Sequence, residues 1–115
     1  MDTIVGLGKA GCAIADKFAQ YPQYKTFKID SEGLDENDKR SYILKRQDHP
    51  EKYEKSTRSM KTFFKEATND VLFVLSGSGL VSGATLRVLK SLKGKNINIL
   101  YIKPDMEFLG QINVM

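Results

Sequence analysis

Two glycine-rich segments have the residue types and the spacing that bind phosphate groups. The first covers residues 6–11 (GLGKAG), and the second covers residues 76–83 (SGSGLVSG). Glycine allows a sharp turn and lets backbone N–H groups come close to an anion. A helix that starts at such a turn adds unpaired N–H donors and a partial positive charge. Lys9, inside the first segment, can add a full charge. The two segments therefore predict an anion site.

Each segment lies between a predicted strand and a predicted helix. Residues 3–6 are apolar, and the helix that follows carries Ala10, Ile14, Phe18 and Tyr21 at helical spacing. Residues 71–75 (VLFVL) are continuously apolar, as in a strand buried on both faces, and the next helix places apolar residues at 84, 88, 89 and 92. Both glycine turns are therefore expected at the carboxyl edge of a parallel sheet, where ligands bind.

Asp30 follows a second predicted strand, residues 24–29, and lies about 20 residues beyond the first turn. A carboxylate at this place suits a ribose hydroxyl. We expect a short strand at 42–44, a helix over 51–67 and a last strand at 97–102. Strands that alternate with helices predict one α/β domain over residues 1–115. Its expected architecture is a three-layer sandwich with a mostly parallel, doubly wound, Rossmann-like sheet in the order 3-2-1-4-5.

Composition narrows the classes of function. The chain is 41% hydrophobic and 28% charged, with a net charge of +4 spread along it, which gives no direct signal for nucleic acid. One cysteine and one histidine exclude a disulfide framework within the chain and make a zinc site built on these residue types improbable. The sequence shows no basic leader and no apolar run long enough to span a membrane, so we expect a cytoplasmic protein.

The chain resembles the tubulin/FtsZ superfamily of GTP-binding filament proteins in five segments, in the same order and at similar spacing. Residues 8–18 (GKAGCAIADKF) are similar to the first nucleotide loop and helix of tubulin. Ile29-Asp30 is similar to the end of the second strand of FtsZ. The other three similar segments are 49–51 (HPE), 70–79 (DVLFVLSGSG) and 103–110 (KPDMEFLG).

This resemblance implies binding of GTP or GDP, with Mg²⁺ held through the nucleotide phosphates. It implies head-to-tail assembly, through the loop edge of the sheet, with the same chain or a partner. The nucleotide would be contacted by Gly8, Lys9, Ala10, Gly11, Cys12, Asp30, Gly77, Ser78, Gly79, Ser82, Gly83, Pro104 and Glu107.

The resemblance covers the N-terminal half of the family's GTP-binding domain. The guanine-reading helix and the acidic loop that triggers hydrolysis lie further on in that family. We therefore expect this chain alone to turn over GTP slowly or not at all, and the sequence assigns no catalytic residue.

Two alternatives stay open. One is a structural or interaction protein that keeps the fold without a nucleotide, because the second turn is two residues shorter than the family signature and Cys12 replaces an Asn. The glycines would then only connect strands to helices. The other is a Rossmann-type dinucleotide binder, because Gly6, Gly8 and Gly11 match the GxGxxG pattern and Asp30 follows it.

Overall fold

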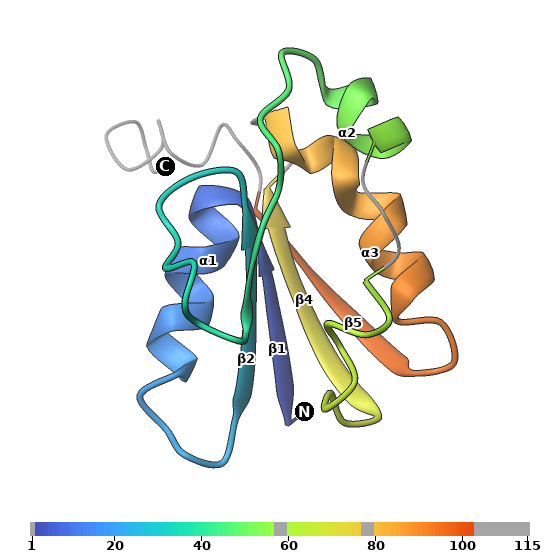
Figure 1. Ribbon diagram of the computed structural model, residues 1–115. Helices are drawn as coiled ribbons and strands as arrows, with labels where there is room; N and C mark the ends of the chain where they lie inside the picture. Colours follow the sequence, from blue (N-terminus) through green and yellow to red (C-terminus); the bar gives the residue numbers. More distant parts are fainter. Residues whose placement is uncertain (1, 57–59, 77–79, 103–115) are drawn as a thin grey trace, which may run out of the picture.

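The computed structural model describes residues 2–56, 60–76 and 80–102. The sheet is parallel throughout, in the predicted order β3-β2-β1-β4-β5, and helices connect its successive strands except between β2 and β3 (Figure 1). The elements are β1 (Thr3–Leu7), α1 (Gly8–Phe18), β2 (Lys25–Asp30), β3 (Ser41–Ile43), α2 (Pro50–Ser56), β4 (Asp70–Ser76), the 3-10 helix η1 (Leu80–Ala84), α3 (Thr85–Ser91) and β5 (Asn96–Ile102).

Helices cover both faces of the sheet, which confirms the three layers of the α/β fold (Figure 1). The alternation of side chains along each strand divides the core accordingly. Ile4 and Val74 point to α1, where they pack with Ala15. The larger cluster on the opposite face combines strand residues such as Val5, Phe27 and Phe73 with helix residues such as Val88. Because β1 lies between β2 and β4, its side chains are fully buried on both faces.

The predicted helix over 51–67 is wrong in its C-terminal part. Helix α2 is described only over Pro50–Ser56, and residues 61–66 form hydrogen-bonded turns. The apolar residues of this segment still enter the core, because Met60 and Phe64 are buried beside Tyr53. The backbone N–H of Met60 donates to Ser91 Oγ at 2.9 Å, so a side chain of α3 replaces a helical hydrogen bond. The spacing of apolar residues alone therefore predicted a helix that is too long.

The polar segment between β2 and β3 is a surface loop, and hydrogen bonds of its own side chains stabilise its turns. Asp35 Oδ1 accepts from the N–H of Asn37 at 2.9 Å, and Asp38 Oδ1 accepts from the N–H of Arg40 at 3.0 Å. These contacts are typical of turns closed by aspartate. No helix lies in this connection. The first residues of the loop, 31–34, line one side of a cavity next to the N-terminal half of α1.

Candidate functional site

The first glycine segment, residues 6–11, forms almost no separate turn, because its residues belong to the end of β1 and the start of α1. Strand β1 extends to Leu7 and α1 begins at Gly8, whose φ of +78° is a conformation that side chains disfavour. Leu7 provides no side-chain cap, and the first turn of α1 contains no acidic residue. The first N–H groups of α1 therefore keep their partial positive charge for an anion.

Two other glycines of this segment are required by packing. A Cβ on Gly6 would overlap the carbonyl group of Gly11, and a Cβ on Gly11 would overlap the carbonyl oxygen of Val74. Both residues let α1 lie directly against β1 and β4. Close packing of a helix on a strand is one function of glycine in nucleotide-binding folds, and it needs no ligand.

The second predicted turn is described in part. Gly77, Ser78 and Gly79 lie outside the described residues, as do Pro104 and Glu107. Ser82 and Gly83 belong to η1. A Cβ on Gly83 would overlap the carbonyl oxygen of Pro50, so this glycine allows η1 to pack against the first residue of α2.

A cavity of about 670 Å³ lies beside the N-terminal half of α1, where β1 and β2 end. Of the described residues predicted to bind nucleotide, it brings together Lys9, Cys12 and Asp30; Gly8, Ala10, Gly11, Ser82 and Gly83 do not line it. The sequence did not single out its other lining residues, which are Ala13, Asp16, Lys28, Ser31, Glu32, Gly33, Leu34, Arg46, Tyr53 and Val81. Four of them directly follow Asp30, and their position after a strand of a parallel sheet was the available signal.

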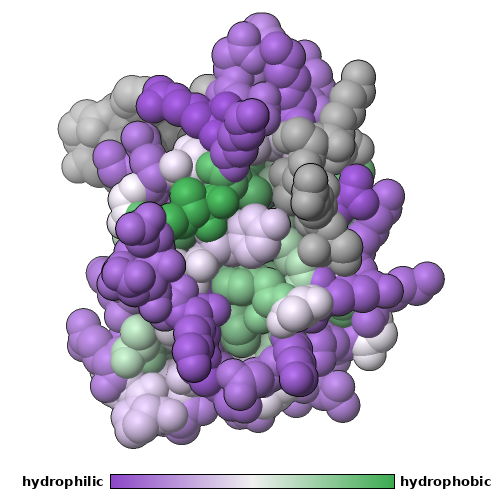
Figure 2. All heavy atoms as spheres, in the orientation of Figure 1, coloured by the Kyte–Doolittle hydropathy of each residue, from purple (hydrophilic) through white to green (hydrophobic). Residues whose placement is uncertain are grey.

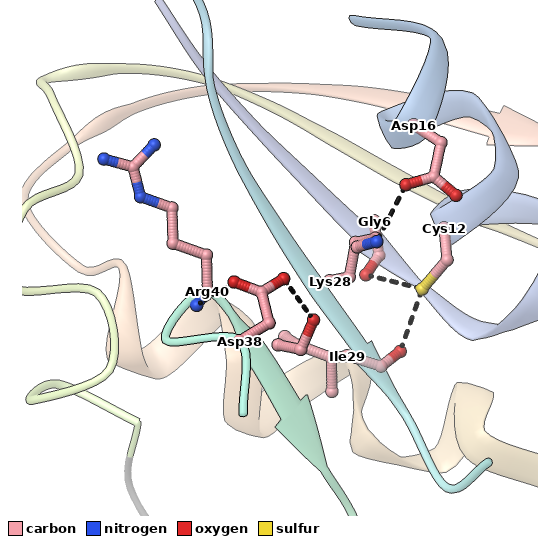
Figure 3. A network of polar contacts seen from close by, with 8 residues as sticks. Gly6, Cys12, Asp16, Lys28, Ile29, Asp38 and Arg40 are labelled. Atoms are coloured by element: carbon pink, nitrogen blue, oxygen red, sulfur yellow. Dashed lines mark hydrogen bonds and ion pairs between the residues drawn. The ribbon is translucent and has the colours of Figure 1, made fainter. Parts of the chain in front are cut away.

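The cavity wall carries three cationic and three acidic side chains. Lys28 Nζ lies 2.8 Å from Asp16 Oδ1, and this hydrogen bond raises the pKa of the lysine (Figure 3). Arg46 and Glu32 approach to 3.8 Å, with both side chains about three-quarters exposed, so their attraction is weak. Within the described part of the chain, Lys9 makes no ion pair. Lys9 therefore remains the cation best placed to receive an anion at α1.

Asp30 is the buried acid of the cavity, with 8% of its surface exposed. Its Oδ1 accepts a hydrogen bond from the N–H of Ser31 at 2.7 Å. Burial raises the pKa of Asp30, and the charge of Lys9 partly opposes this shift. A buried carboxylate with remaining acceptor capacity can bind a hydroxyl group that enters the cavity.

Cys12 lies at the inner wall, and its thiol points to the backbone of the sheet. Sγ is 3.5 Å from the carbonyl oxygens of both Gly6 and Ile29 (Figure 3). Burial raises the pKa of this thiol to about 12, so it stays protonated at neutral pH. A protonated thiol that donates to the backbone is a packing group and has no nucleophilic character.

Figure 2 shows one face of the molecule, on which hydrophilic residues lie mainly around the margin and hydrophobic residues are visible toward the centre. In the part of the chain that the structure describes, no group of three or more His, Cys, Asp or Glu residues is arranged to hold a metal ion. None of the helices in residues 2–56, 60–76 and 80–102 combines the length and hydropathy needed to cross a lipid bilayer.

Comparison of the chain with protein-family models, curated proteins and solved structures gives no match. The structure alone defines the class of the protein: it is an α/β domain with a parallel, Rossmann-like sheet and a cavity at the carboxyl edge of that sheet.

Proposed function

We propose that this protein binds a nucleotide, with its phosphates at the N-terminus of α1, and that it prefers GTP as the resemblance to the tubulin/FtsZ superfamily implies. The observation that carries the proposal is the cavity of about 670 Å³ at the uncapped start of α1, with Lys9 in its wall. Small-molecule sites commonly have volumes of about 300–1,000 Å³, so a nucleotide is of suitable size.

In this proposal, the first N–H groups of α1 donate to phosphate oxygens and Lys9 supplies a full positive charge. Asp30, at the end of β2, accepts a hydrogen bond from a ribose hydroxyl. Mg²⁺ is held mainly by phosphate oxygens and water, as is usual for this ion. The loop edge of the sheet, completed by a neighbouring copy or a partner chain, is the surface for head-to-tail assembly. Turnover by the chain alone is slow or absent.

Calorimetric titration of the full chain with GTP, GDP and NADH tests the proposal. Wild-type protein should bind GTP saturably, and Lys9→Gln should weaken GTP binding by about tenfold, the usual cost of one charge-assisted hydrogen bond. Lys17→Gln is the matched control, because Lys17 is exposed at the other end of α1 and should leave binding unchanged. A folded wild-type protein that gives no saturable heat with GTP or GDP contradicts the proposal.

The alternative without a nucleotide is favoured by the glycines. Gly6, Gly11 and Gly83 each lie against a carbonyl group of a neighbouring element, so packing explains them without a ligand. In that case the same titrations give no binding for any variant, while Gly83→Ala still lowers stability. Tighter binding of NADH than of GTP would instead favour the dinucleotide binder, for which Gly6, Gly8, Gly11 and Asp30 match the pattern.

A further inference from the structure

The cavity beside α1 is long as well as wide. On the α1 side it is lined by Lys9, Cys12, Ala13 and Asp16. These residues are spaced at i, i+3, i+4 and i+7, so they lie in one row along one face of the helix. Seven residues of α-helix rise by about 10 Å. The cavity therefore continues along α1 for about this distance beyond the anion site at Lys9.

The opposite wall is formed by β2, where Lys28 and Asp30 alternate onto the same face of the strand. The positive charge of Lys9 acts on the carboxyl group of Asp30, so these two side chains belong to one end of the cavity. Lys28 Nζ lies 2.8 Å from Asp16 Oδ1, so this ion pair belongs to the other end (Figure 3). The cavity thus has a cationic end for phosphates, an acid for ribose beside it, and a charged pair about 10 Å away.

Small and apolar side chains line the cavity between its two ends. Cys12 directs its thiol to the backbone carbonyl oxygens of the sheet, and Ala13 has only a methyl group. Leu34, half-buried in the loop after β2, lines the same cavity. A flat ring packs well against such side chains, so the space beyond the ribose is suited to a base.

The Asp16–Lys28 pair has hydrogen-bonding capacity that the protein does not use. In the described part of the chain, each side chain makes only the hydrogen bond that joins them. A carboxylate accepts several hydrogen bonds and an ammonium group donates three, so both can bind a further group. The exposed fractions are 58% for the side chain of Asp16 and 23% for that of Lys28, and a pair this open adds little to stability.

We propose that Asp16 and Lys28 bind the base of the nucleotide and select guanine. This inference rests on the nucleotide site proposed above. Guanine presents the O6 acceptor next to the N1–H and N2–H₂ donors on one edge. Lys28 Nζ donates to O6, and the carboxylate of Asp16 accepts from N1–H and N2–H₂. Adenine has an amino group in place of O6 and an unprotonated N1, so both protein groups would face the wrong partner.

Calorimetric titration of the full chain with GTP, ATP and xanthosine triphosphate tests the proposal. The wild type should bind GTP at least about tenfold more tightly than ATP. Asp16→Asn should weaken GTP binding at least about tenfold, the usual effect of one hydrogen bond to a charged group, and should not weaken ATP binding. Xanthine has a carbonyl oxygen in place of the 2-amino group of guanine. Because the new amide can donate to that oxygen, Asp16→Asn should bind xanthosine triphosphate more tightly than the wild type does.

Asp48→Asn is the matched control. Asp48 forms an ion pair of 2.9 Å with Lys52 that does not line the cavity, so this variant should bind all three nucleotides like the wild type. Circular dichroism should show that both variants are folded. Lys9→Gln should weaken GTP and ATP by the same factor, because Lys9 contacts phosphate.

The possible outcomes separate this inference from the proposed function. Equal affinity of the wild type for GTP and ATP overturns base selection by Asp16 and Lys28, but it leaves the phosphate site intact if Lys9→Gln weakens both. An equal effect of Asp16→Asn on GTP and ATP overturns it in the same way, because the residue then acts on the whole site. A folded wild type that binds none of the three nucleotides overturns both proposals.

Discussion

The thiol of Cys12 is the side chain whose ionisation the fold perturbs most clearly. It is 7% exposed, it lies between two backbone carbonyl oxygens, and its pKa is raised from 9.0 to about 12. The folded protein therefore binds the thiol proton more tightly than the unfolded chain does. The stabilisation is complete below pH 9 and is lost as the pH rises from 9 toward 12, because the unfolded chain releases the proton first.

We therefore expect the free energy of unfolding of the wild type to fall more steeply above pH 9 than that of Cys12→Ala. The difference between the two proteins should change by about 1 kcal/mol for each pH unit above 9, the order of magnitude of one titrating proton. Urea unfolding of both proteins at pH 7, 9 and 10 measures it. Parallel curves for the two proteins would show that the thiol is not held as a neutral donor.

The sequence predicted some of the cavity residues that lie next to the ends of strands. Lys9 and Asp30 could be found because a strand followed by glycine, or by an acid, marks the carboxyl edge of a parallel sheet. Arg46 and Tyr53 could not be predicted, since they reach the same cavity from a loop and a helix that are distant in sequence. Lys28 is a similar case. Its alternation with Phe27 and Ile29 predicts which face of the sheet its side chain lies on, but it does not predict the contact with Asp16 or the position in the cavity wall.

At the scale of elements, α1 is held against the sheet at backbone distance. Gly6 and Gly11 leave no room for a side chain between the helix and the strands. Ala15 continues this narrow contact, and it is fully buried against Ile4 and Val74. The position of α1 sets where its first N–H groups point, so the packing of these small residues also positions the anion site.

Gly11→Val should therefore lower the free energy of unfolding by at least about 2 kcal/mol, because the new side chain must displace the backbone of β4 at Val74. The matched control is Ala13→Val, which introduces the same side chain at an exposed position of the same helix and should cost only a few tenths of a kcal/mol. Thermal or urea unfolding of both variants measures the difference. Equal stabilities would mean that α1 moves away from the sheet at little cost.

The strands were predicted to within one or two residues, and the helix over 51–67 was not. Strands buried on both faces have continuous apolar runs, and strand order follows from the crossover rules. Residues 60–64 also have apolar spacing that fits a helix, but a turn can bury the same side chains when a distant group accepts its N–H. Ser91 Oγ accepts the N–H of Met60 in this way, and the sequence near Met60 does not predict a partner so distant in the chain.

At the scale of the whole molecule, the two halves of the core share their strands. Strand β1 contributes Ile4 to one face and Val5 and Leu7 to the other, and β4 contributes Val74 and Phe73 in the same way. Loss of either face removes packing from the same two strands. The domain is therefore expected to unfold as one cooperative unit.

Amide hydrogen exchange measured by NMR should show the slowest exchange in β1 and β4, because their hydrogen bonds open only when both faces of the core are lost. The amides of β3 should exchange at least about tenfold faster, since this strand has three residues and lies at an edge. Equal protection of β3 and β1 would contradict a central cooperative unit.

Gly33 has a practical consequence. It belongs to the cavity wall, yet a Cβ at this position would meet no atom within 4 Å, and it lies in an exposed loop without a helix or strand. Exposed loop tips of this kind tolerate inserted peptides. A fluorescent reporter joined beside Gly33 would respond to whatever enters the cavity, so the domain could be made into a sensor by which its own ligand is identified from a library of metabolites.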